Sequence, residues 1–237
     1  MFKSFRYIIS FLCVGLLLGC SSDSATDPND PKFDVPEEGV TLNLNNTFQV
    51  IDHFGASGGF QDQWVGKWPE ATKNQVAKLL FSTETDGQGN PQGIGLSLWR
   101  TIIGDGAADQ ANSGFSASNW FRETECYLDA NGNYDWTKQA GATAPPYFMS
   151  KNGYVFSTPD VISFNCDPDK YDDYANFLAD VVKNYEDKGF NIVTMSPFNE
   201  TQYEWNAEVG NAQQSGTKAT NAEVATVTRI IDDVFTQ

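Results

Sequence analysis

The stretch YDDYANFLADVVKNYEDKGFNIVTMSPF, residues 171–198, decides the fold class. Its first part has the period of an amphipathic helix, and Gly189 follows as a helix-ending residue. Its second part, FNIVTMSPF, is a short apolar run of the kind that forms a strand buried in a parallel sheet. A helix that leads straight into a buried strand predicts an α/β fold. Five large side chains share the helical face: Tyr174, Phe177, Leu178, Val181 and Tyr185.

The same alternation occurs on both sides of this stretch. Pro69 opens a predicted helix over residues 70–81, and the apolar run IGLSLWR at 94–100 predicts a second buried strand. Further along the chain, Thr220 and Glu223 form a capping box that starts a final helix. Strands separated by helices in this way predict a parallel sheet.

Polar residues stand at the predicted carboxyl ends of two strands. Arg100 closes the run at 94–100, and Asn199 and Glu200 follow FNIVTMSPF. In parallel α/β folds the functional residues gather at this end of the sheet. The placement makes these three residues candidates for a site.

Residues 1–20 have the pattern of a processing signal. Two basic residues precede an apolar stretch at 7–18, which is too short to span a bilayer, and LLGCSS follows. The pattern indicates a bacterial lipoprotein signal, cleaved before Cys20, whose thiol then carries the lipid. We therefore expect a cell-envelope protein anchored to the membrane. The alternative is an ordinary secretory signal with an incidental cysteine.

The folded part is expected over residues 40–237. Residues 21–39 are polar, acidic and proline-bearing, which predicts a flexible tether. TLNLNNTFQVI at 41–51 alternates apolar and polar residues around two asparagines, which predicts a hairpin or paired edge strands.

The composition of the chain argues against nucleic acid as a partner and gives a weak indication of sugar binding. The chain has 31 acidic and 15 basic residues, a formal charge of −16, so a phosphate backbone is repelled and nucleic acid is not an expected partner. Aromatic residues make up 14% of the chain, which is a weak pointer to sugar binding because rings stack on the apolar faces of sugars.

Cysteines and histidine argue against a metal or redox site. Cys126 and Cys166 lack CxxC spacing, and His53 is the only histidine, so we expect no metal and no cofactor. In an oxidising compartment the two cysteines can form a disulfide, and the sequence leaves their pairing open.

Glu200 is the candidate acid. It lies among Phe198, Tyr203 and Trp205, and desolvation by such neighbours raises a carboxyl pKa, which suits a general acid. The alternative is a solvated loop glutamate, which is the commoner outcome for an isolated Asn-Glu pair.

Seven segments, in order, give the chain a family resemblance. It resembles glycoside hydrolase family thirty, a group of retaining glycosidases, and is most similar to the endo-β-1,6-galactanase branch. The segments are IDHFGASGGF (51–60), LLFS (79–82), GIGLSLWRTIIGDG (93–106), YDW (134–136), PPYFMSKNG (145–153), DKYDDYANFLADVV (169–182) and SPFNETQYEW (196–205).

The resemblance implies roles for three residues. Glu200 matches the acid/base after the fourth barrel strand, and Asn199 matches the neighbour that hydrogen-bonds the sugar 2-hydroxyl. Arg100 matches an arginine that orients the carboxylates; its alternative role is an ion pair that stabilises the end of the barrel.

The resemblance also implies substrate contacts. Tyr203 and Trp205 lie where the family has subsite aromatics, although core packing is an equal alternative for each. Trp64 and Asp62 are expected to line the first loop. His53 stands where relatives usually have glycine, and we give it no role.

The chain departs from the family pattern in three places. Thr201 replaces a proline. Residues 137–144 are too few for the helix and third strand that relatives have there, since a parallel crossover needs a dozen or more residues, so we expect an internal loss of roughly twenty residues. The family's nucleophile, a glutamate after the seventh strand, has no match up to Gln237.

The prediction is an α/β fold that forms part of a (β/α)8 TIM barrel, with a remnant of a side β-domain. Its predicted function is hydrolysis of a β-linked polysaccharide with retention of configuration, and β-1,6-galactan is the first candidate substrate. We also expect the chain to be truncated and inactive on its own. Two alternatives stay open: a non-catalytic glycan-binding surface lipoprotein, and the same chemistry on β-1,4-xylan or β-1,6-glucan.

Overall fold

The computed structural model describes residues 43, 45–104, 121–122, 124–138, 142–151, 161, 164–211 and 216–236. The chain divides into two units, residues 1–50 and residues 51–237. The signal at 1–20, the tether at 21–39 and Cys20 lie outside the described residues.

The described residues of the first unit form no strand. Residues 43 and 45–50 are exposed, and a turn is closed by the Asn46 N–H, which donates to the Asn43 carbonyl at 3.1 Å. The hairpin predicted for 41–51 is therefore wrong for this part of the chain. An isolated two-stranded hairpin is marginal in water, so alternation without a covering layer is not enough to form one.

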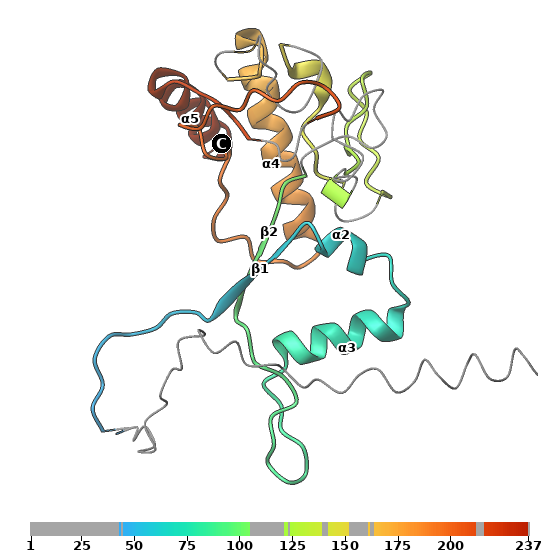
Figure 1. Cartoon of the computed structure of the whole chain (residues 1–237), viewed down its shortest axis with the longest axis vertical. Helices are drawn as coiled ribbons and strands as arrows, with labels where there is room; N and C mark the ends of the chain where they lie inside the picture. Colours follow the sequence, from blue (N-terminus) through green and yellow to red (C-terminus); the bar gives the residue numbers. More distant parts are fainter. Residues whose placement is uncertain are drawn as a thin grey trace, which may run out of the picture. The chain divides into compact units, whose positions relative to one another are not determined.

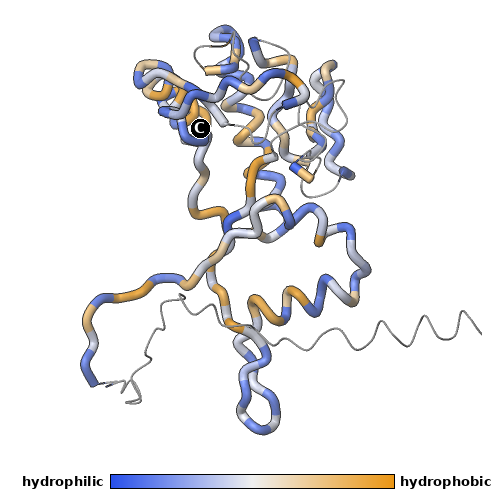
Figure 2. The backbone as a smooth tube through the Cα atoms, in the orientation of Figure 1, coloured by the Kyte–Doolittle hydropathy of each residue, from blue (hydrophilic) through white to orange (hydrophobic). Residues whose placement is uncertain are grey.

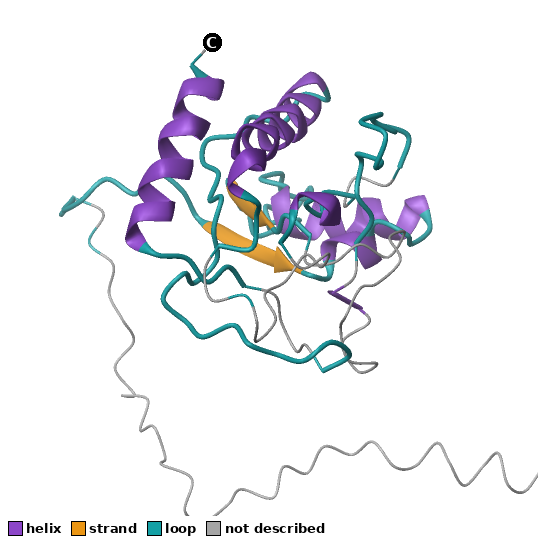
Figure 3. Cartoon of the chain, turned by 90° about the horizontal axis from the view of Figure 1, so that it is seen from above, coloured by secondary structure: helices purple, strands orange, loops and turns teal. Residues whose placement is uncertain are grey.

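The second unit begins with a strand–helix–strand segment (Figures 1 and 3). Strand β1 (Gly55–Gly59) is followed by helices α2 (Asp62–Val65) and α3 (Glu70–Phe81) and then by strand β2 (Leu98–Thr101). β1 and β2 pair in parallel, with Gly55 opposite Leu98. The parallel α/β alternation is confirmed for this segment.

Local sequence explains why α3 has these bounds. Pro69 is its N-cap residue, with φ −54°, and an acidic Glu70 in the first turn and a basic Lys78 in the last turn complement the helix dipole. The predicted helix over 70–81 is confirmed at both ends. Apolar and hydrophilic residues alternate along it (Figure 2).

Neither predicted buried strand is buried. β2 covers only the end of the run at 94–100, and Ile94 and Leu98 are 71% and 40% exposed. No strand forms at 190–198, where Phe190 and Val193 are 59% and 57% exposed. The sheet has two strands in the described residues, so these apolar side chains have no covering layer, and the described residues form no barrel.

The core lies further along the chain, around two helices that contact each other, α4 (Tyr171–Asp187) and α5 (Asn221–Phe235). The loops at 124–128 and 142–149 pack against α4, with short 3₁₀ helices η2 (Tyr147–Met149) and η3 (Pro168–Lys170). The largest fully buried side chains are Tyr127, Phe177, Leu178, Val227 and Cys126.

Both helices follow the predicted signals. The predicted apolar face of α4 is buried, with Tyr185 partly so, and Gly189 ends the helix with φ 91°. At the start of α5 the Thr220 hydroxyl accepts from the Glu223 N–H at 3.2 Å, and the Glu223 carboxylate accepts from the Thr220 N–H at 2.8 Å. The capping box is thus confirmed.

The core contains two cysteines. Cys126 and Cys166 are both buried and form no disulfide with each other, which answers the question of pairing that the sequence leaves open. Burial raises the pKa of Cys166 from its ordinary 9.0 to about 12.

Among the described residues, no helix combines the length and apolar character needed to cross a membrane.

Candidate active site

The segment 196–205 carries the candidate acid and is held from one side by the core. The buried Tyr174 of α4 donates its hydroxyl to the Pro197 carbonyl at 2.7 Å. The ring of Phe198 packs edge-on against Phe164, with ring centroids 5.2 Å apart. Phe198 therefore belongs to the core. These contacts fix the start of the segment onto α4.

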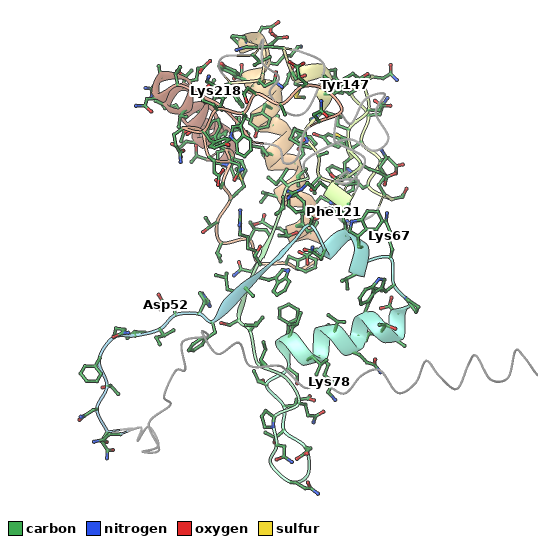
Figure 4. All side chains as sticks on the ribbon, viewed as in Figure 1. Asp52, Lys67, Lys78, Phe121, Tyr147 and Lys218 are labelled. Atoms are coloured by element: carbon green, nitrogen blue, oxygen red, sulfur yellow. The ribbon has the colours of Figure 1, made fainter. Side chains whose placement is uncertain are left out.

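Residues 217–219, just before α5, hold the same segment on both sides of Glu200. The Thr217 N–H donates to the Asn199 carbonyl at 2.9 Å, and the Ala219 N–H donates to the Thr201 carbonyl at 3.2 Å. Thr220, the N-cap of α5, follows directly. The Lys218 ammonium, beside α5 (Figure 4), pairs with the Glu204 carboxylate. Both flanks of Glu200 are thus tied to the paired helices.

Glu200 itself has an unusual backbone. Its φ is 49°, the only positive φ of a non-glycine residue in the described part of the chain. Left-handed backbone is unfavourable for residues with a Cβ and is found at functional sites when the surroundings enforce it. Here the Glu200 carbonyl accepts two N–H donors, from the Tyr203 backbone and the Trp205 indole, each at 3.0 Å.

The side chain of Glu200 faces solvent, whereas the sequence predicted a desolvated carboxyl. The aromatic side chains beside it do not bury it. Tyr203 is 60% exposed, and its ring lies 4.8 Å from that of Trp205 at 57°. Trp205 is half-buried, because Gly216 packs against its indole. The loop thus presents an exposed carboxyl and, three residues later, an exposed aromatic ring, on a backbone held by hydrogen bonds.

Arg100 and Glu200 are not joined by an ion pair in the described structure. Arg100 is exposed on β2, paired in register with Ser57. Asn199 is half-buried beside Glu200. The structure therefore places two of the three predicted catalytic residues in one loop and the third at the end of β2.

Trp64 and Asp62 have structural contacts at the end of β1. The Asp62 carboxylate accepts from the Trp99 indole at 3.1 Å and lies where a Cβ on residue 58 would fall, so only glycine fits there. The Trp64 indole donates to the Phe121 carbonyl at 2.8 Å, and the Lys67 ammonium lies 4.0 Å from its ring centroid (Figure 4).

Tyr185 of α4 has a pKa above its ordinary value. Burial raises the pKa of Tyr185, and the hydroxyl of Tyr127 and the negative charge of Asp62 raise it further.

Two residues that position the loop were missed by sequence reasoning. Tyr174 stands on the apolar face of α4 and was taken only as core, although a buried tyrosine hydroxyl needs a partner. Gly216 carries no local signal, since its need for glycine comes from the indole of Trp205, which is distant along the chain: an added Cβ would fall 1.7 Å from the ring.

Comparisons with known proteins agree with this fold. A family model described as O-glycosyl hydrolase family 30 matches residues 37–236. A solved structure, the crystal structure of a conserved exported protein from Bacteroides fragilis, matches with 31% sequence identity and a TM-score of 0.69. The match covers 82% of this chain and 43% of that one, so this chain spans less than half of its length. Curated proteins gave no match. The family model spans the strand–helix–strand segment, the core and the loop of Glu200, and the chain therefore belongs to O-glycosyl hydrolase family 30.

Proposed function

We propose that this chain carries the acid/base of a retaining glycosidase that hydrolyses β-linked polysaccharide, with β-1,6-galactan as the first candidate. The observation that supports this proposal is the backbone of Glu200. A glutamate held at φ 49°, exposed and tied on both flanks to α4 and α5, is a group kept in an unfavourable conformation for a purpose other than stability. The family supplies the reaction class.

In the proposed reaction Glu200 acts twice. As a carboxylic acid it protonates the glycosidic oxygen while a second carboxylate attacks the anomeric carbon, which breaks the glycosidic bond and forms a glycosyl-enzyme. As a carboxylate it then removes a proton from water, which attacks the same carbon and releases the sugar with retained configuration. The second carboxylate is the glutamate that the family has after its seventh strand.

Neighbouring residues have proposed supporting roles. Tyr203 offers the exposed ring on which an apolar sugar face can stack, and Asn199 is the proposed partner of the sugar 2-hydroxyl. Arg100 is proposed to orient the carboxylates from β2. Trp64 and Asp62, just after β1, are proposed to line the first loop of the site.

We also propose that the protein is exported and lipid-anchored through Cys20. The signal-like pattern at 1–20 supports this, as does the description of the matched Bacteroides fragilis protein as exported.

The deciding experiment compares the unmodified protein with Glu200→Gln on β-1,6-galactan, β-1,4-xylan and β-1,6-glucan. The assay uses the chain and any longer product of its gene. We expect Glu200→Gln to abolish turnover of these polysaccharides, whose leaving groups need protonation, while aryl glycosides with good leaving groups still react in the first step. The first-formed product should show the β-anomer by NMR.

Equal polysaccharide turnover by both proteins would remove Glu200 from the mechanism. Galactan binding in affinity electrophoresis without any hydrolysis would favour the glycan-binding alternative. That the 237-residue chain is inactive on its own stays a prediction, and turnover by that chain, lost in Glu200→Gln, would overturn it.

A further inference from the structure

We propose that Trp205 is a positioning residue, whose indole N–H holds Glu200 in its left-handed conformation. The inference rests on the proposed function, because it explains how the acid/base is aimed. It differs from the role expected from the resemblance, in which Trp205 serves as a sugar-stacking platform.

The first step concerns the Glu200 carbonyl. It accepts the Tyr203 N–H at 3.0 Å, which closes a turn, and the Trp205 indole N–H at 3.0 Å. A turn N–H is available to any sequence, but the indole donor depends on a tryptophan five residues along the chain. With both bonds made, the orientation of the peptide unit after Glu200 is set from two directions.

The second step concerns the indole, which is itself held in place. Gly216 packs so closely against it that a Cβ there would lie 1.7 Å from the ring carbon Cε2. The N–H of the next residue, Thr217, donates to the Asn199 carbonyl at 2.9 Å, and the centroid of the Tyr203 ring lies 4.8 Å from that of the indole. The indole therefore cannot turn away without displacing residues 216–217, which also hold Asn199.

The third step links φ to the carboxyl. The direction of the Cα–Cβ bond relative to the loop depends on φ, so a return of Glu200 to a negative φ would swing its side chain away from its present direction. A general acid must lie within hydrogen-bond reach of the oxygen that it protonates. An indole that holds φ at 49° therefore aims the acid.

The test is nuclear magnetic resonance on the chain labelled with ¹⁵N-glutamate. In a left-handed residue the amide and α protons lie closer together than in any other common conformation, so Glu200 should show a strong intraresidue cross-peak, identified by its loss in Glu200→Gly. Trp205→Phe keeps a packing ring but removes the N–H, and we expect it to weaken that cross-peak. Tyr203→Phe, which keeps the backbone donor, is the matched control and should leave it unchanged.

A second measurement needs no variant and covers the case in which Trp205→Phe does not fold. In the unmodified chain, the indole N–H of Trp205 should exchange with solvent at least tenfold more slowly than that of Trp68, which is 47% exposed. Equal exchange rates, or a cross-peak of full strength in Trp205→Phe, would overturn the proposal.

Catalysis gives an independent readout. Where galactan hydrolysis is measured, Trp205→Phe should lower kcat by about 10- to 100-fold and leave KM unchanged, since misplacing a catalytic group affects the chemical step. A raised KM with unchanged kcat would instead assign Trp205 to sugar binding and overturn the positioning role. Absence of hydrolysis by any longer product of the gene, together with the expected resonance results, would count against the proposed function and leave the hold of Trp205 on Glu200 standing.

Discussion

Two regions of the second unit both contain helices but differ in burial. No residue from 55 to 101 is buried, although β1, α3 and β2 all lie there. Residues 124–234, in contrast, contain the hydrophobic core, centred on α4 and α5. The difference teaches that secondary structure forms where local signals are strong, whereas burial requires another layer of chain on the apolar face.

The first test of this difference in burial makes the same substitution, leucine to alanine, in both regions. Leu178→Ala, in α4 where the side chain is 1% exposed, should lower the free energy of unfolding by about 2–5 kcal/mol. Leu79→Ala, in α3 where the side chain is 63% exposed, should change it by no more than about 0.5 kcal/mol. Denaturant unfolding measures both. A loss at Leu79 as large as that at Leu178 would show that the face of α3 is covered in solution.

The hydrogen bond between the core and the loop of Glu200 gives the next largest expected effect on stability. Tyr174→Phe removes the hydroxyl that donates to the Pro197 carbonyl at 2.7 Å, and should cost about 1–3 kcal/mol because that carbonyl loses its donor. Tyr203→Phe, at an exposed side chain, is the matched control and should cost no more than about 0.5 kcal/mol. Equal losses in urea unfolding would contradict the anchoring role of Tyr174.

The buried thiol of the core region predicts a pH dependence. Because burial raises the pKa of Cys166 from 9.0 to about 12, the folded state binds this proton more tightly than the unfolded state. The resulting stabilisation is present below about pH 9 and is lost as the pH rises toward 12, by about 1.4 kcal/mol at pH 10. Unfolding at pH 8 and pH 10 should show a smaller alkaline loss for Cys166→Ala. An equal loss of unfolding free energy between pH 8 and pH 10 in the unmodified protein and in Cys166→Ala would contradict this role of the thiol.

The smallest expected effect has the opposite sign. Glu200→Gly removes the left-handed penalty of roughly 1–2 kcal/mol, partly offset by the greater freedom of glycine in the unfolded chain. We expect a gain of a few tenths to about 1 kcal/mol in the free energy of unfolding. A loss of stability would mean that the Glu200 side chain contributes more than its backbone costs.

Local patterns predicted the helices well. The bounds 70–81, the end of α4 at Gly189 and the capping box of Thr220 and Glu223 all depend on residues within one helical turn, and all three are confirmed. The strands were predicted poorly. The apolar runs at 94–100 and 190–198 were expected to be buried, but an apolar run does not specify which segment will cover it.

The candidate site shows the same division. The pattern placed Asn199 and Glu200 together and Arg100 at the end of another strand, and the family resemblance assigned their roles. The sequence pattern also predicted that the Glu200 carboxyl is desolvated, whereas the structure places Glu200 in solvent. Burial of a side chain depends on neighbours from elsewhere in the chain, which spacing does not reveal.

The sequence by itself determined the family, the helices and the identity of the candidate acid, because each depends on residue types at short, fixed spacings. Only the tertiary structure decided which apolar faces are covered and how Glu200 is held. Its left-handed backbone depends on the Trp205 indole, and the place of that indole depends on Gly216 and on the segment that leads into α5. Such contacts join residues that are close in space and separated in sequence, so only the folded chain brings them together.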